Sequence, residues 1–161
     1  MDIATQFELK ECIFLSARDT NGNINNTILN KIKNDVEGKC IKAGYVMRNT
    51  ITIISRTLGA INHANFTGVI TFNVIYHAMI YNPGIGAIVK CYVASIDKSQ
   101  IVCYIDNIDI SPMEIYLYKN HHVGNVNFIN LKINDKINVK ILASKFNFGD
   151  TQIIAIAQYI D

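Results

Sequence analysis

Several features that would narrow the function at once are missing from this sequence of 161 residues. No stretch approaches the ~18 consecutive apolar residues that a membrane span needs. The N-terminus carries an acid and no apolar run, so it does not resemble a signal peptide. The four cysteines form no CxxC pair, and we expect them to be buried free thiols of an intracellular protein: Cys12, Cys40, Cys91 and Cys103.

Signals of catalysis are also missing. The sequence holds no GxGxxG, no P-loop lysine, no GxSxG and no conspicuous pair of carboxylates. His121 and His122 are adjacent, but neighbouring side chains of a strand point to opposite faces, and no suitably spaced acid or cysteine accompanies them. We interpret them as a solvated loop pair. Gly84 and Gly86 precede a strand rather than a helix, so they do not form a phosphate loop. We therefore expect no enzyme, no metal and no cofactor.

Charge is nearly balanced, with a formal net charge of +2. Splitting the chain at Pro83 gives eight Lys or Arg against six Asp or Glu before it, and seven against seven after it. A balanced surface does not by itself attract a polyanion, so any contact with nucleic acid must come from a local patch.

What the sequence does contain is a large apolar fraction and a clear change of pattern in its middle. Half of the residues are apolar, enough to bury a core, and the many isoleucines favour strands. Residues 69–81 alternate between apolar and other side chains, as a strand with one buried face does. Asn82-Pro83-Gly84-Ile85-Gly86 follows and must break the strand. We predict that this break joins two small domains.

The first predicted domain, residues 1–82, has one helix and several strands. Residues 25–37 place Ile28, Ile32 and Val36 on one helical face, and Gly38 is positioned to cap the helix end. Strands are predicted over 7–17, 45–48, 51–56 and 69–81. A helix packed on an antiparallel sheet makes a two-layer α+β unit.

The second predicted domain, residues 83–161, has five strands and little helix. These strands are 87–96, 101–106, 113–119, 136–146 and 152–160, and the longest link, 120–135, looks irregular. Five short strands in so small a domain predict an oligonucleotide-binding (OB) type β-barrel. The fold class of the whole chain is therefore α+β.

One face of the predicted barrel collects tyrosines. Apolar residues alternate inward along three strands, which leaves five polar or aromatic side chains outward: Lys90, Tyr92, Tyr104, Tyr116 and Tyr118. Flat rings beside a cation make a stacking platform for single-stranded bases, worth roughly 1–3 kcal/mol for each base. The alternative is that these tyrosines pack against another protein surface, a role that suits tyrosine equally well.

Several motifs occur in the order found in a known family. They are the helix end 35–40, Gly44-Tyr45-Val46, residues 72–78, and the junction 82–86 followed by a valine-bearing strand. With this layout, the chain resembles the stalk subunit of multisubunit DNA-directed RNA polymerases, which is the seventh subunit of the eukaryotic enzymes and has an archaeal counterpart.

The resemblance implies a non-catalytic polymerase subunit with an N-terminal tip that docks on the polymerase core and an OB barrel near the emerging RNA. It also implies a helical second stalk subunit as a partner. Apolar loop residues without an obvious core partner are the expected docking points, together with two glycines: Ile41, Gly44, Leu58, Gly59 and Ile61. The isoleucine, asparagine and lysine bias suggests a divergent version from a large DNA virus. The expected location is the virion and host cytoplasm in that case, and the nucleus for a cellular protein.

Two other classes remain open at this stage. One is a free-standing single-stranded RNA-binding protein that uses the barrel alone. The other is a purely structural assembly subunit that makes no contact with nucleic acid. Purification from the native source separates the free-standing protein from a stalk subunit, because only a polymerase subunit would co-purify with a large polymerase assembly.

Overall fold

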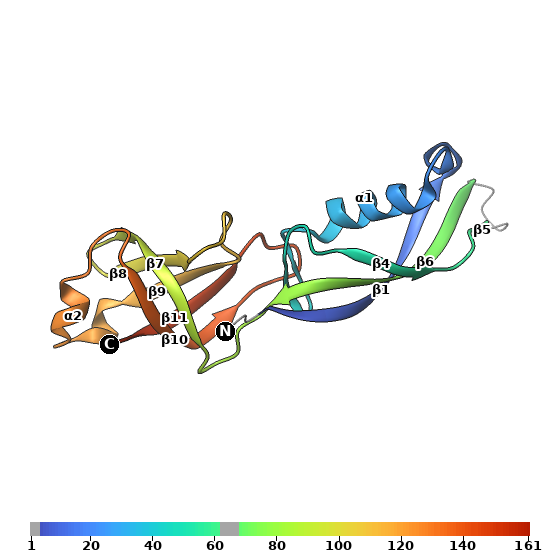
Figure 1. Cartoon of the computed structure of the whole chain (residues 1–161). Coiled ribbons are helices and arrows are strands. Elements are labelled where there is room, and N and C mark those ends of the chain that lie inside the picture. Colours follow the sequence, from blue (N-terminus) through green and yellow to red (C-terminus); the bar gives the residue numbers. More distant parts are fainter. Residues whose placement is uncertain (1–3, 62–67) are drawn as a thin grey trace. The chain divides into compact units, whose positions relative to one another are not determined.

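The computed structural model describes residues 4–61 and 68–161 and has an α+β fold (Figure 1). Contacts divide the chain into two compact units, one within Met1–Gly38 and Val46–Ile80, the other within Lys39–Tyr45 and Tyr81–Asp161. The elements of the first half are β1 (Ala4–Ser16), the 3-10 helix η1 (Ala17–Thr20), α1 (Ile24–Val36), β2 (Cys40–Ile41), β3 (Gly44–Val46), β4 (Thr52–Arg56), β5 (Ala60–Ile61) and β6 (Val69–Tyr81). Those of the second half are β7 (Ile88–Ile96), β8 (Gln100–Ile105), β9 (Met113–Tyr118), η2 (Lys119–His122), α2 (Val126–Ile129), β10 (Lys136–Lys145) and β11 (Ile153–Ile160).

The first unit is an antiparallel sheet with α1 against one face (Figure 1). The strand β6 neighbours β1, and it also pairs with β4 and β5. The predicted alternation of β6 is confirmed, since its even-numbered residues from Phe72 to Ile80 are buried. The predicted helix is confirmed to within one residue at each end, and Gly38 follows it with a φ of +70°. The buried side chains of α1 and β6 form the core between the helix and the sheet.

The inner face of α1 should dominate the stability of this unit. Ile28 and Ile32 have 0% exposure, so truncating either side chain to a methyl group leaves a cavity. We expect Ile28→Ala to lower the free energy of unfolding by about 2–5 kcal/mol. Asn30→Ala, an exposed change in the same helix, should stay within about 0.5 kcal/mol. Urea unfolding followed by helical circular dichroism measures both, and equal effects of the two changes would contradict this packing.

The second unit is a closed five-stranded barrel in the order β10-β11-β9-β8-β7. Every pair is antiparallel except β9 with β11, which run parallel. This arrangement fits the OB fold predicted from the sequence. The five predicted strands are all present, with limits that differ by a residue or so. The predicted strand break is also confirmed, because β6 ends at Tyr81, β7 begins at Ile88, and Gly86 between them has a φ of +85°.

A short N-terminal segment belongs to the barrel unit. The hairpin of β2 and β3 pairs Cys40 with Tyr45, and contacts group residues 39–45 with the barrel. The N–H of Cys40 donates to the carbonyl of Asp150 at 2.7 Å, and the N–H of Gly149 donates back to the carbonyl of Cys40 at 2.8 Å. The two units are therefore not separated by one cut in the sequence.

Two interpretations made from the sequence are wrong: that residues 120–135 are irregular, and that His121 and His122 are both solvated. The link is not wholly irregular, because it contains α2, and only His121 of the histidine pair is exposed. His122 is 5% exposed, and both of its ring nitrogens are bonded. The N–H of Tyr159 can only donate, so Nε2 of His122 accepts at 2.9 Å and Nδ1–H donates to the carbonyl of Tyr118 at 2.7 Å. A neutral, fixed imidazole thus holds η2 to β11.

The expectation of buried free thiols holds for three cysteines and is wrong for Cys12. Cys40, Cys91 and Cys103 are buried and unpaired, whereas Cys12 is exposed on β1. Burial, with the carboxylate of Asp150 nearby, raises the pKa of Cys40 to about 11. A hydrogen bond with Cys103, followed by burial, raises the pKa of Cys91. Thiols held in the protonated form are poor nucleophiles, so Cys40 and Cys91 are packing residues.

Candidate nucleic-acid interface

The outward side chains of three barrel strands lie where the sequence predicted them. We call Lys90, Tyr92, Tyr104, Tyr116 and Tyr118 the tyrosine face. Their inward neighbours, such as Cys91, Cys103 and Ile115, have 0% exposure, whereas Lys90 is exposed and the four tyrosines are half-buried. The barrel core therefore fixes the backbone of the face and directs these side chains outward.

Strand register brings the tyrosines together as neighbours. Tyr92 lies directly opposite Tyr104, with ring centroids 6.2 Å apart and an angle of 61° between the planes. Tyr116 and Tyr118 are two residues apart on β9, with ring centroids 6.5 Å apart and an angle of 17°. Tyr118 in turn meets His121 edge-on at 5.9 Å. Such aromatic pairs stabilise each other by about 0.5–1.5 kcal/mol, so the rings are held in place before any ligand binds.

A carboxylate stands among these rings. Glu114 on β9 lies opposite Tyr104, and Tyr116 is two residues further along the same strand. Partial burial, followed by the negative charge and hydrogen bonding of Glu114, raises the pKa of the Tyr104 and Tyr116 hydroxyls. Both hydroxyls therefore stay protonated as donors, while Glu114 itself would repel a phosphate. The face is consequently suited to bases rather than to the phosphate backbone.

Lysines of β10 lie beside the tyrosine face, together with the acids Asp106 and Asp161. The strand β10 pairs with β7 and sets Lys136 opposite Tyr92, Asn138 opposite Lys90, and Lys140 opposite Ile88. Lys136 Nζ lies 3.0 Å from Asp106 Oδ2, which offsets part of its charge. A polar hollow of about 480 Å³ includes Lys90, Lys136 and Asn138 in its lining. Lys90 and Lys136 are candidate phosphate contacts beside the aromatic rings, although two acids line the same hollow.

Sequence reasoning missed Lys136 and Lys140 of β10 as candidate binding residues. Along β10, exposed and buried residues alternate from Lys136 to Ile141, so the sequence alone could have placed Lys136 and Lys140 on the outer face of the barrel. The pairing of β10 with β7 was not readable, because about 40 residues separate the two strands.

Glu114 offers a test of the electrostatics of the face. Replacing it as Glu114→Gln should lower the pKa of Tyr104 and Tyr116 toward the ordinary value, measured by ultraviolet titration. It should also strengthen binding of single-stranded RNA by roughly two- to fivefold, because a like charge nearby in water costs up to about 1 kcal/mol. Asp97→Asn removes the same charge from the β7–β8 turn and should leave both the tyrosine pKa values and RNA binding unchanged. Weaker RNA binding by Glu114→Gln would show that the carboxylate contacts a base.

The predicted docking residues are divided between the two units. Leu58 and Ile61 belong to the first unit, and their apolar side chains face solvent with exposures of 88% and 56%. Gly59 between them is needed for close packing, since a Cβ there would lie 2.6 Å from Cγ2 of Ile70. Ile41 is half-buried and Gly44 is buried, and both belong to the barrel unit. Exposed apolar surface therefore lies at residues 58–61, while Gly44 has a backbone role.

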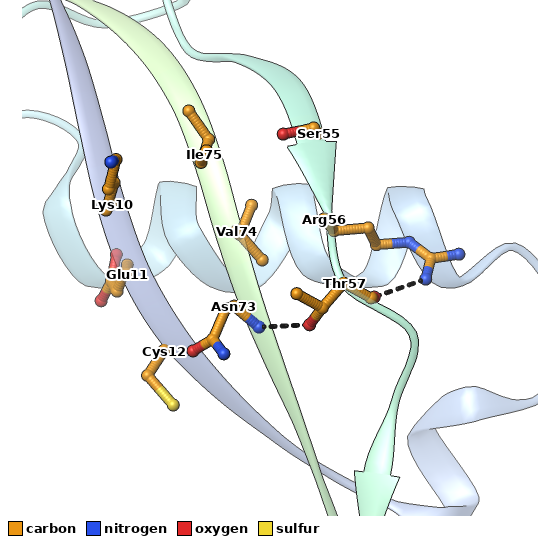
Figure 2. Close-up of a pocket in the computed structure, with 9 residues that line it drawn as sticks. All are labelled: Lys10, Glu11, Cys12, Ser55, Arg56, Thr57, Asn73, Val74 and Ile75. Carbon is orange, nitrogen blue, oxygen red and sulfur yellow. Dashed lines mark hydrogen bonds between the residues drawn. The ribbon is translucent and has the colours of Figure 1, made fainter.

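The first unit also carries an open hollow of about 420 Å³ across β1, β4 and β6 (Figure 2). Lys10 and Cys12 of β1 contribute to it, with Ser55 of β4 and Asn73 of β6. The N–H of Asn73 donates to Oγ1 of Thr57 at 3.0 Å. The N–H of Thr57 donates in turn to the carbonyl of Asn73 at 2.9 Å, so these hydrogen bonds hold the chain after β4 against β6 at the hollow.

The part of the chain that the structure describes contains neither a cluster of metal-ligating side chains nor a membrane-spanning helix. Within residues 4–61 and 68–161, no group of three or more His, Cys, Asp or Glu is placed to hold a metal ion. Over the same ranges, no helix has both the length and the apolar character to cross a membrane.

Comparison with known proteins finds a relative that aligns along nearly the whole chain. No family model matches this sequence. The chain is similar to a protein of Acanthamoeba polyphaga mimivirus that is described as a "putative DNA-directed RNA polymerase subunit". The two are 26% identical over an alignment 169 positions long, which covers 97% of this chain and 81% of the mimivirus protein.

Proposed function

We propose that this chain is a non-catalytic subunit of a DNA-dependent RNA polymerase, in the stalk position. The observation that carries the proposal is the similarity to the mimivirus protein, which extends through both units of the chain. A relative that shared only the barrel would support no more than a common OB fold. The succession of a two-layer α+β unit and an OB-type barrel agrees with the stalk-subunit resemblance.

In this proposal the two units have different tasks. The first unit docks on the polymerase core through the exposed apolar residues Leu58 and Ile61. The barrel contacts emerging single-stranded RNA through the tyrosine face, with bases on the rings and phosphates along Lys90, Lys136 and Lys140. A helical second stalk subunit is a further proposed partner. The protein acts where its polymerase transcribes, and it supports initiation without performing chemistry.

Purification of the tagged chain from its native source tests the assignment. Recovery of the large polymerase subunits in a stoichiometric complex is the expected result, read by mass spectrometry. Recovery of the chain alone, with bound RNA, would instead favour the free-standing RNA-binding protein.

A purely structural subunit is the second candidate, and Glu114 is the observation that favours it. A carboxylate between Tyr104 and Tyr116 weakens attraction for a polyanion, and the barrel half has no net charge to compensate. A chain that co-purifies with polymerase but shows no RNA affinity would have this role.

A further inference from the structure

The barrel unit has a second candidate binding surface, which shares no residue with the tyrosine face. It is a hollow of about 290 Å³ at the end of the barrel that carries α2 (Figure 1). Its buried wall consists of Ile101, Phe128 and His122, which are 2%, 3% and 5% exposed. The rings of His122 and Phe128 stack with centroids 4.1 Å apart and an angle of 10° between the planes. The wall is therefore rigid and mostly hydrocarbon.

The imidazole does not make this hollow polar. Its Nδ1 is bonded to the carbonyl of Tyr118 and its Nε2 to the N–H of Tyr159. Neither nitrogen has a remaining hydrogen-bonding position for a ligand, since each ring nitrogen makes one such bond in the ring plane. A ligand in the hollow would therefore meet the stacked rings as apolar surface, and a polar ligand group would find no hydrogen-bond partner on the imidazole.

Aliphatic side chains surround the hollow and are open to solvent. Ile96, Val123 and Ile129 line it and are 38%, 85% and 71% exposed. Val126 and Ile133 lie nearby in the sequence, on α2 and just beyond it, and are 67% and 58% exposed. Single exposed aliphatics are common on protein surfaces, but a group of them around an apolar hollow marks an interaction site.

Size and charge indicate the occupant. A hollow of about 290 Å³ lies just below the usual range of small-molecule sites, roughly 300–1,000 Å³, and suits one or two bulky side chains of a peptide. Lys119 is the one lining residue with a fixed charge, and no acid lines the hollow. Its backbone N–H is bonded to the carbonyl of Ser99 at 3.0 Å, which fixes its position at the rim. A carboxylate beside the inserted side chain would complement this lysine.

We propose that the α2 end of the barrel is a docking pocket for an acidic, amphipathic segment of a partner protein, which inserts one bulky apolar side chain between Phe128, Val123 and Ile129. An apolar anchor in a pocket with a charged rim is the arrangement that dominates affinity in protein interfaces. This pocket does not depend on the polymerase assignment or on RNA binding, because it shares no residue with the tyrosine face.

Nuclear magnetic resonance titration of the full chain with defined peptides tests the proposal. The probe is a capped peptide of sequence Glu-Glu-Phe-Leu-Glu-Glu, and its counterpart carries Lys at every Glu. The acidic peptide should shift the amide signals of Val123, Gly124 and Ile129 and bind at least fivefold more tightly than the basic one. Equal binding of both peptides, or an absence of shifts at these amides up to millimolar peptide, would overturn the proposal.

Single-residue variants distinguish peptide binding in the pocket from non-specific binding elsewhere on the surface. Ile129→Asp changes an exposed residue, so folding should survive while binding of the acidic peptide falls at least tenfold. Lys119→Glu should reverse the preference between the two peptides. Ile154→Asp is the matched control, because Ile154 is 50% exposed on β11 and does not line the hollow. An equal loss in Ile154→Asp, or no loss in Ile129→Asp, would show that the pocket is not the binding site.

Discussion

If the proposed docking is right, replacing Leu58 and Ile61 together by aspartate is expected to release the chain from the RNA polymerase core while leaving it folded. Both side chains are exposed in the isolated chain, so the change costs little in the free protein. In a docked interface each aspartate would be a buried, unpaired charge, which costs several kcal/mol. A loss of that size weakens binding by roughly a hundredfold or more. The amount of large polymerase subunits retained by the tagged variant measures the effect.

The matched control is Ile54→Asp, at an apolar residue of the same unit that is 50% exposed. It should retain the polymerase, because Ile54 lies outside the loop 58–61. Equal release by Ile54→Asp would assign the docking surface to the sheet as a whole. Full retention of polymerase by the double variant would remove this loop from the interface. Point variants are preferable to fragments cut at residue 82, because such a cut separates Cys40 from its backbone partners Gly149 and Asp150.

The second large effect concerns RNA. Replacing Tyr92, Tyr104 and Tyr116 by alanine is expected to weaken binding of single-stranded oligouridylate roughly tenfold or more, since each stacked base contributes about 1–3 kcal/mol. The expected loss is below the sum of three full contributions, because Tyr92 and Tyr104 already contact each other. Fluorescence anisotropy of a labelled oligonucleotide with the full chain measures the change.

Phenylalanine at the same three positions is the control for this prediction. The rings remain while the hydroxyls are lost, so RNA affinity should stay within about threefold if stacking carries the binding. Unchanged affinity in a folded alanine variant would instead assign the tyrosine face to packing against a partner. A large loss in the phenylalanine variant would mean that the hydroxyls donate hydrogen bonds to the RNA.

Much of the fold could be predicted because its signals are local. The alternation along residues 69–81 assigned one face of β6 to the core, and the same reasoning turned Tyr92, Tyr104 and Tyr116 outward. Helical spacing placed Ile28 and Ile32 against the sheet. Proline and glycine near residue 83 broke the strand because they cannot continue a ladder there. Each inference needs only a short window of sequence.

Other features depended on which distant segments meet. Alternation along β1 places Cys12 on the face opposite buried Ile13, but whether that face is covered depends on the tertiary structure, in which Cys12 is exposed. His122 looked like a loop residue until η2 and β11 supplied partners for both nitrogens. The hollow beside α2 draws its lining from three stretches of the barrel unit, around residues 96–101, 119–124 and 128–131. No short window contains these neighbours.

The sequence by itself therefore determined the longer strands, the position of the helix α1, and which side chains of those strands leave the core, but it missed the two-residue strands β2 and β5. Only the tertiary structure decided that β10 closes the barrel on β7 and sets Lys136 beside Tyr92, and that Glu114 stands among the tyrosines opposite Tyr104. The physical reason is that the direction of a side chain follows from the local period of its element. The neighbours of a strand follow instead from closure of the whole barrel, which joins segments far apart along the chain.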